Sequence, residues 1–177
     1  MRKIAVIMLI LMLLLIACQK KQVEEVKEKN EEKTTSLLEN GKFSLEYPKE
    51  WGKKESDGMF ILLPTGKEEL NIIVKHEVVE KEVTNDDLKA FFERISESFE
   101  EAEKKTKEIK IDDKNGYETS VSFKSVEEDG SKTEQIIISR YVVVDGNLYL
   151  FEVGGKSQVY SDNKEKIEAA YSTFKIK

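Results

Sequence analysis

The stretch that decides the fold covers residues 133–153 and reads TEQIIISRYVVVDGNLYLFEV. Two apolar runs flank the dipeptide Asp145-Gly146, which is a strong signal for a two-residue β-hairpin turn. Ile136–Ile138 and Tyr141–Val144 are apolar on both faces of an extended chain, a pattern typical of a strand covered on both sides. We therefore expect two antiparallel strands joined by this turn, the first of them inside a sheet.

Alternating apolar and polar residues predict further strands on either side of the hairpin. Pro48 closes the earliest of them, and Pro64-Thr65-Gly66 closes the next. The first three strands follow one another through short turns, which predicts an antiparallel meander. The expected strands cover Phe43–Pro48, Met59–Leu63, Glu69–Val79, Lys107–Ile111, Tyr117–Val126, Thr133–Val144 and Leu148–Val153.

Two segments have the apolar spacing of helices. The first is capped by Thr84 or Asn85, and its apolar stripe is Leu88, Phe91, Phe92, Ile95, Phe99 and Ala102. Its charged continuation, Glu100–Lys107, reads as a solvated helix end. The second helix is expected to begin at Ser161 or Asp162, with a stripe of Ile167, Ala170, Tyr171 and Phe174. Residues 173–176 fit either a helix end or an extended segment.

These elements predict one α+β domain over residues 37–177, a mainly antiparallel β-sheet flanked by helices. The formal charge of −6 argues against a nucleic-acid-binding protein, which needs a basic surface to neutralise phosphates. A single Cys rules out an internal disulfide framework. A single His leaves few candidate residues for general acid–base catalysis.

The N-terminus has the pattern of a secretory signal. Arg2 and Lys3 precede Ile4–Ala17, an apolar run that is too short for a membrane-spanning helix of about 20 residues. The ending Leu15-Ile16-Ala17-Cys18 resembles the bacterial lipobox. That resemblance implies that residues 1–17 are a signal peptide and that Cys18 becomes the acylated (palmitate-bearing) N-terminus. The alternative is a signal anchor in which Cys18 remains an unmodified thiol.

Residues 18–36 are expected to be a tether between lipid and domain. Gln19–Ser36 contains five Lys and five Glu and hardly any apolar residue. Such a segment cannot bury enough apolar surface to offset the conformational entropy that it would lose on folding. Removal of Arg2 and Lys3 leaves 27 basic and 35 acidic residues, a charge of −8. A negative body is repelled by anionic lipid, so the lipid on Cys18 must provide the membrane attachment.

Gly41–Trp51, with the sequence GKFSLEYPKEW, resembles the opening of PsbP-like domains, in which a first strand ends in Tyr-Pro-x-x-Trp. Phe60–Pro64 matches the strand that follows, and the order of the elements agrees. The chain is thus similar to PsbP-related or DcrB-like bacterial lipoproteins. The resemblance implies a three-layer α/β/α sandwich, an accessory role beside a membrane, and no shared catalytic residues.

The candidate binding surface consists of Tyr47 and Trp51. The favoured alternative is that the Trp51 ring covers one end of the core. His76 has no second ligand at metal-binding spacing and reads as a strand-end histidine. Asp112–Gly116 offers oxygen ligands but lies between strands, so a turn with Gly at positive φ explains it better than a calcium loop. Gly154-Gly155 reads as a turn.

No catalytic residue, metal site or cofactor is expected. The leading hypothesis is a non-enzymatic lipoprotein, held on the extracytoplasmic side of the cell membrane, whose domain binds or helps assemble another envelope protein. The alternative is a small-ligand or ion-binding lipoprotein that uses a cleft between the sheet and a helix.

Overall fold

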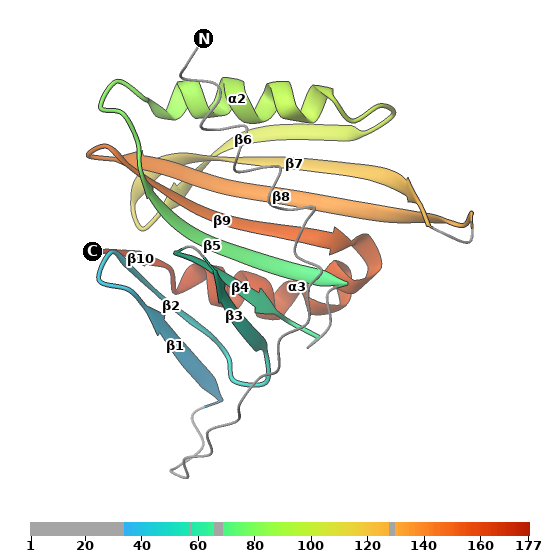
Figure 1. The fold of residues 1–177 in the computed structure, drawn as a ribbon, viewed down its shortest axis with the longest axis horizontal. Coiled ribbons are helices and arrows are strands. Elements are labelled where there is room, and N and C mark those ends of the chain that lie inside the picture. Colours follow the sequence, from blue (N-terminus) through green and yellow to red (C-terminus); the bar gives the residue numbers. More distant parts are fainter. Residues whose placement is uncertain (1–33, 57, 66–68, 128–129) are drawn as a thin grey trace. The chain divides into compact units, whose positions relative to one another are not determined.

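Strands dominate the chain (Figure 1). The computed structural model describes residues 34–56, 58–65, 69–127 and 130–177. In chain order the elements are β1 (Thr35–Glu39), β2 (Phe43–Pro48), β3 (Gly52–Ser56), β4 (Met59–Leu63), β5 (Leu70–Val78), α2 (Asn85–Glu97), β6 (Glu103–Ile111), β7 (Lys114–Val126), β8 (Lys132–Val144), β9 (Asn147–Lys156), α3 (Ser157–Ser172) and β10 (Lys175–Ile176). The signal sequence, Cys18 and most of the tether lie outside the described residues.

The larger sheet has seven strands in the order β3-β4-β5-β9-β8-β7-β6, with every pair of neighbours antiparallel. The hairpin of β8 and β9 closes at Val144 and Asn147. Asp145 and Gly146 have φ values of 50° and 73°. Positive φ at both central residues is what a tight hairpin turn requires. The sequence prediction of an interior strand and a two-residue turn is therefore confirmed.

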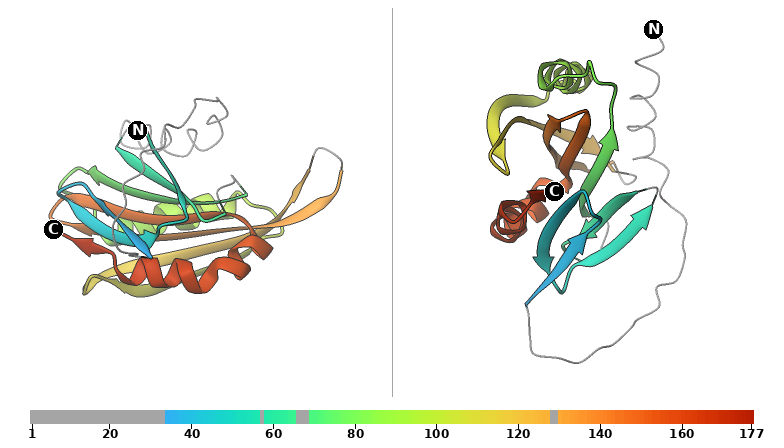
Figure 2. Two further views of the ribbon diagram at one scale, coloured as in Figure 1. Left: turned by 90° about the horizontal axis from the view of Figure 1, so that it is seen from below. Right: turned by 90° about the vertical axis from the view of Figure 1, so that its left-hand side faces the viewer.

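Helices α2 and α3 lie on opposite faces of this sheet (Figure 2). Tyr141 of β8 packs with Leu88 of α2, whereas the next residue, Val142, belongs to a core cluster with Ile167 of α3. This arrangement follows from the period of a strand, in which successive side chains point to opposite faces. The α+β fold with helical layers on both faces of the sheet is confirmed.

A second sheet of three strands, in the order β1-β2-β10, adds to the layer that contains α3. Phe43 of β2 is fully buried and stacks on Phe174 beyond α3, with 5.4 Å between the ring centroids. Strand β2 pairs with β1 and β10 and not with β4, so the predicted meander of the first three strands is wrong. The Trp51-Gly52 turn leads instead into β3, which the sequence analysis missed, and β3 pairs with β4.

Several element boundaries also differ from the prediction. Strand β1 begins at Thr35, inside the expected tether. The helix α2 has the expected cap, since Thr84 and Asp87 form a reciprocal capping box, but it ends at Glu97. Glu101 then turns with a φ of 54°, and residues 103–107 form part of the edge strand β6 rather than a helix end. The charged residues Glu103, Lys104, Lys105 and Lys107 suit such an edge because charges discourage pairing with another chain.

The remaining differences concern turns. Asp112 and Asp113, with φ values of 46° and 64°, make the β6–β7 turn by themselves, and Gly116 lies in β7. Gly154 and Gly155 lie within β9 and form no turn. The last helix accordingly begins at Ser157, and no side chain caps its N-terminus. The extended alternative for the C-terminal residues is confirmed by β10.

In the part of the chain that the structure describes, no helix has the length and apolar character to cross a membrane.

Candidate functional site

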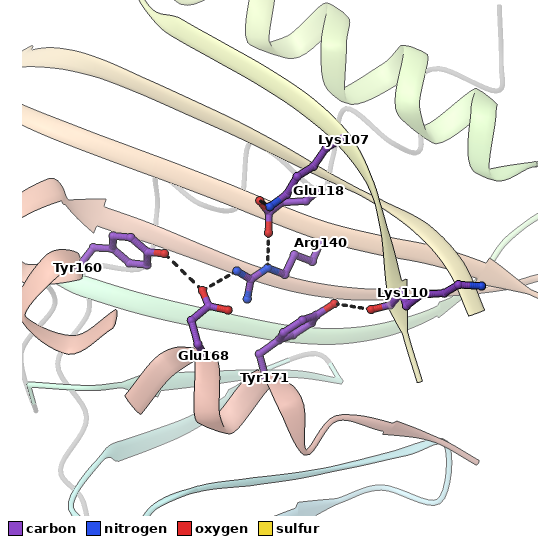
Figure 3. Close-up of polar contacts among 7 residues, drawn as sticks. All are labelled: Lys107, Lys110, Glu118, Arg140, Tyr160, Glu168 and Tyr171. Carbon is purple, nitrogen blue, oxygen red and sulfur yellow. Dashed lines mark hydrogen bonds and ion pairs between the residues drawn. The ribbon is translucent and has the colours of Figure 1, made fainter. Parts of the chain in front are cut away.

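The most unusual side chain of the sheet is Arg140, in the middle of β8. Strand alternation turns it toward α3, where it is 5% exposed. Its Nε donates to Glu118 Oε2 of β7 at 2.7 Å, and its Nη2 donates to Glu168 Oε1 of α3 at 2.6 Å. One guanidinium therefore joins two strands of the sheet to the helix that covers them (Figure 3).

Both carboxylates have a second partner. Lys107 Nζ of β6 lies 2.8 Å from Glu118 Oε1, and the Tyr160 hydroxyl donates to Glu168 Oε1 at 3.4 Å. Tyr171 lies over the guanidinium, with 4.2 Å between its ring centroid and Arg140 Cζ. Its hydroxyl donates to the Lys110 carbonyl oxygen at 3.3 Å, which ties the helix to the edge strand β6.

These contacts set the charges of the site. Burial acts to raise the pKa of Glu118, but hydrogen bonds from Lys107 and Arg140 outweigh it and hold that pKa below its ordinary value. Burial acts to lower the pKa of Arg140, and the two carboxylates raise it further than burial lowers it. Burial raises the pKa of Tyr160 and of Tyr171 to about 12. At neutral pH the site therefore presents the Arg140 guanidinium, the Glu118 carboxylate and two protonated phenols.

The network forms the wall and floor of a cleft of about 480 Å³ between α3 and strands β6–β8, which we call the Arg140 cleft. Tyr160, Lys164, Glu168 and Tyr171 recur at one-turn spacing on α3 and form one wall. The opposite side is formed by Lys107, Ile109, Lys110, Glu118, Ile138 and Arg140. The side chain of Lys110 points away from the network, and only its backbone faces Tyr171 (Figure 3). This arrangement can hold a small molecule against an apolar floor between fixed charges.

The structure places the predicted binding surface elsewhere, inside the protein. Tyr47 is 7% exposed and Trp51 is 4% exposed, and their ring centroids lie 6.5 Å apart within the main core. They do not form an exposed platform, because β2 and the turn after it pack them against the core, as the alternative interpretation predicted. Trp51 Nε1 is buried without a hydrogen-bond partner among the described residues.

The other candidates have structural partners. His76 is half-buried near the end of β5, with its Nε2 lying 2.9 Å from Asn147 Oδ1. Asp112 accepts hydrogen bonds from the Ile176 backbone amide at 2.9 Å and from Lys175 Nζ at 3.0 Å, so it fastens β10 to the β6–β7 turn. Among the described residues, no group of three or more His, Cys, Asp or Glu is placed to hold a metal ion.

The sequence analysis missed the Arg140 cleft. A signal was present, because Arg140 is one of only three arginines and interrupts the apolar run IIISRYVVV. A charge in a strand covered on both sides must have a buried partner. The identity of that partner could not be read from the sequence, since Glu118 and Glu168 are 22 and 28 positions away.

No protein-family model and no curated protein matches this sequence. Solved structures share its fold. Cyanobacterial PsbP (CyanoP) from Synechocystis sp. PCC 6803 is 12% identical, with a TM-score of 0.56 over 86% of this chain and 98% of that one. The Ran-binding protein Mog1p of Saccharomyces cerevisiae is 11% identical, with a TM-score of 0.51 over 80% and 95% of the two chains. LpqN of Mycobacterium tuberculosis, which is involved in cell envelope biogenesis, is 8% identical, with a TM-score of 0.53 over 80% and 90%. Such low identities show a shared fold alone, and the PsbP-like fold is thereby confirmed.

Proposed function

We propose that this protein is a lipid-anchored, non-enzymatic binding module on the extracytoplasmic side of the bacterial cell membrane, where it contacts or helps assemble another envelope protein. The observation that carries the proposal is the ending Leu15-Ile16-Ala17-Cys18 of a short apolar run, followed by a charged tether. Each buried methylene of an acyl chain contributes about 0.8 kcal/mol, so two or three long chains on Cys18 would hold the protein firmly.

The shared fold supports the binding role. Mog1p is described as Ran-binding and LpqN as involved in cell envelope biogenesis, so related folds serve in a protein complex and in the envelope. A fold hosts many functions, and these neighbours therefore suggest a class of role and no specific partner.

The anchor is tested with the full chain in a bacterial host fed an alkyne-bearing palmitate analogue. We predict that the wild-type protein takes up the label and stays in the membrane fraction after alkaline washing. Cys18→Ser should lose the label entirely, because serine offers no thiol for the thioether to the lipid. The matched control Gln19→Ser, one position further on, should behave like the wild type. Equal labelling of Cys18→Ser, or no labelling of the wild type, would contradict the anchor.

The binding role needs a reciprocal experiment. Crosslinking in intact cells of the source bacterium should recover an envelope protein with the full chain. A tag on that partner should then recover this chain, with less recovered for Cys18→Ser because the variant is no longer held at the membrane. Failure to recover any partner in both directions would count against the role.

A second candidate function, binding of a small ligand, is favoured by the Arg140 cleft. The cleft lies between the sheet and helix α3, which is the position expected for a ligand-binding cleft in this fold. Polar groups converge there around an apolar floor.

A further inference from the structure

We infer that the Arg140 cleft binds a small organic anion, with its carboxylate or phosphate group between Arg140 and Lys164 and its apolar part over Ile109 and Ile138. The inference rests on the second proposed function, small-ligand binding, and is independent of the lipid anchor.

The size and lining of the cleft suit such a ligand. Its volume of about 480 Å³ falls within the range of about 300–1,000 Å³ that is typical of small-molecule sites. Ile138 is buried and Ile109 is half-buried, and both belong to or pack on the main core cluster. An apolar group placed over them would bury its surface against a rigid floor, because β6 and β8 are held within the sheet.

The charges of the cleft favour an anion. Lys107, Arg140 and Lys164 are cationic and Glu118 and Glu168 are anionic, which leaves one positive charge in excess even without Lys110, whose side chain points away. Both carboxylates are already engaged, one by Lys107 and Arg140 and the other by Arg140 and Tyr160. The ammonium group of Lys164, by contrast, takes part in no ion pair within the described part of the chain. It lies one turn before Glu168 on the same wall and is exposed.

Within the described chain, Arg140 has one guanidinium nitrogen whose hydrogen-bond donors are not used. Its Nη1 is buried and has no hydrogen-bond partner among the described residues. A buried charged donor that lacks an acceptor is costly, whereas a charge-assisted hydrogen bond to an anionic oxygen is strong. Because Nη1 is closed to solvent, a neighbouring side chain must move before a ligand reaches it. Tyr171, stacked over the guanidinium, is such a neighbour, so its environment should change on binding.

The competing interpretation is that the network only fastens α3 to the sheet and that no ligand enters. The two interpretations differ in what the tyrosine rings report. The chain has six tyrosines, of which Tyr160 and Tyr171 line the cleft and Tyr47 lies in the core away from it.

The test uses the full-length chain in phosphatidylcholine nanodiscs, with ¹³C-labelled tyrosine rings assigned through single Tyr→Phe variants. The probes are 4-phenylbutyrate, its uncharged amide 4-phenylbutanamide, and inorganic phosphate, with empty nanodiscs as a reference for partitioning. We expect 4-phenylbutyrate to shift the Tyr160 and Tyr171 signals saturably and to leave Tyr47 unchanged. The amide should bind at least about tenfold more weakly, because it lacks the charge. Phosphate should also bind more weakly than 4-phenylbutyrate, because it lacks the apolar part.

Variants locate the anion. Lys164→Gln should weaken 4-phenylbutyrate binding roughly three- to fivefold, the upper part of the range for losing one solvent-exposed ion pair. Lys166→Gln is the matched control, since Lys166 lies two residues further along the helix, pairs with Glu50 and does not line the cleft. It should leave binding unchanged.

Three results would each overturn the inference: no saturable shift of Tyr160 and Tyr171, equal binding of the amide and the carboxylate, or equal effects of the two lysine variants. The first would leave the network with a purely structural role. None of the three would bear on the lipid anchor, which is tested separately by labelling of Cys18.

Discussion

Among single residues, Gly155 in β9 is required because a neighbouring strand leaves no space for a side chain, whereas its neighbour Gly154 is not. A Cβ on Gly155, whose φ is +148°, would lie 2.3 Å from the Glu69 carbonyl oxygen and 2.8 Å from Leu70 Cα. A Cβ on Gly154 would meet only Asn71 Oδ1, at an ordinary 3.6 Å. Gly155 therefore permits the backbone of Glu69 and Leu70, at the start of β5, to lie close to β9, where Gly155 pairs with Leu70.

We predict that Gly155→Ala lowers the free energy of unfolding by about 3 kcal/mol, because it combines backbone strain with a clash against main-chain atoms. Gly154→Ala is the matched control and should change stability by less than about 1 kcal/mol. Urea denaturation of both variants measures the difference. Equal effects would show that the close approach at Gly155 does not limit stability.

At the scale of elements, Arg140 is the cross-link between β7, β8 and α3. The same residue lines the candidate cleft. The Arg140 side chain therefore both holds α3 against the sheet and shapes the candidate site. Removing one member of a buried ion-pair network lowers protein stability more than replacing all of its charged members. The reason is that the remaining buried charge loses a partner and is poorly solvated.

Arg140→Met should therefore destabilise the protein by up to about 3 kcal/mol, the low end of the range for a broken buried pair. Glu118 is largely buried at 13% side-chain exposure but keeps its ion pair with the more exposed Lys107. The triple variant that also carries Glu118→Gln and Glu168→Gln should recover much of that loss. Chemical denaturation of the two proteins provides the comparison. If the triple variant is as unstable as Arg140→Met, loss of packing by the guanidinium is responsible, and not the buried carboxylates that have lost Arg140.

The loss of stability in Arg140→Met should depend on pH. The pKa of Glu118 in the folded protein lies below its ordinary value of 4.5, so the stability that Glu118 contributes is present above that value and is lost as the pH falls through the folded pKa. Arg140→Met removes part of what lowers the pKa. The stability difference between wild type and Arg140→Met should therefore be largest at about pH 7 and should narrow as the pH falls below 4.5. A difference that is constant with pH would contradict this account of Glu118.

At the scale of the whole molecule, the small sheet and the large sheet share one core. Phe43 of β2 stacks on Phe174 and meets the edge of Phe60 in β4 at 6.0 Å between centroids. One fully buried ring thus joins the small sheet, the chain beyond α3 and the large sheet. Residues 33–177 accordingly form one compact unit.

We predict that Phe43→Ala costs about 3–5 kcal/mol and leaves a single unfolding transition. Fluorescence of Trp51 and far-ultraviolet circular dichroism should follow the same denaturation curve. Val126→Ala, at a residue that is 68% exposed, should change stability by less than about 0.5 kcal/mol. Separate transitions for the two probes would show that the sheets unfold independently.

Local structure can be read from the amino-acid sequence alone wherever one periodicity or one turn dominates. The apolar run before Asp145-Gly146 specified a hairpin, because only residues that tolerate positive φ make a two-residue turn. Thr84 specified the start of α2, because its cap hydrogen bonds are local. The Gly41–Trp51 motif and the element order were enough to identify the fold. Strands β1 and β3 were not predicted because neither short strand has apolar alternation: β1 contains two adjacent leucines and β3 is polar. Such strands are defined by the partners they pair with.

The candidate site, in contrast, arises from the packing of distant elements. Arg140, Glu118, Glu168 and Lys107 lie on four different elements, and each alone is an ordinary charged residue in the sequence. Tyr47 and Trp51, which the sequence made prominent, are core residues, whereas the lone arginine of an apolar strand lines the cleft. The reason is physical: periodicity tells which face of a strand a residue occupies, but packing of distant elements decides which charges meet there and whether a space remains between them.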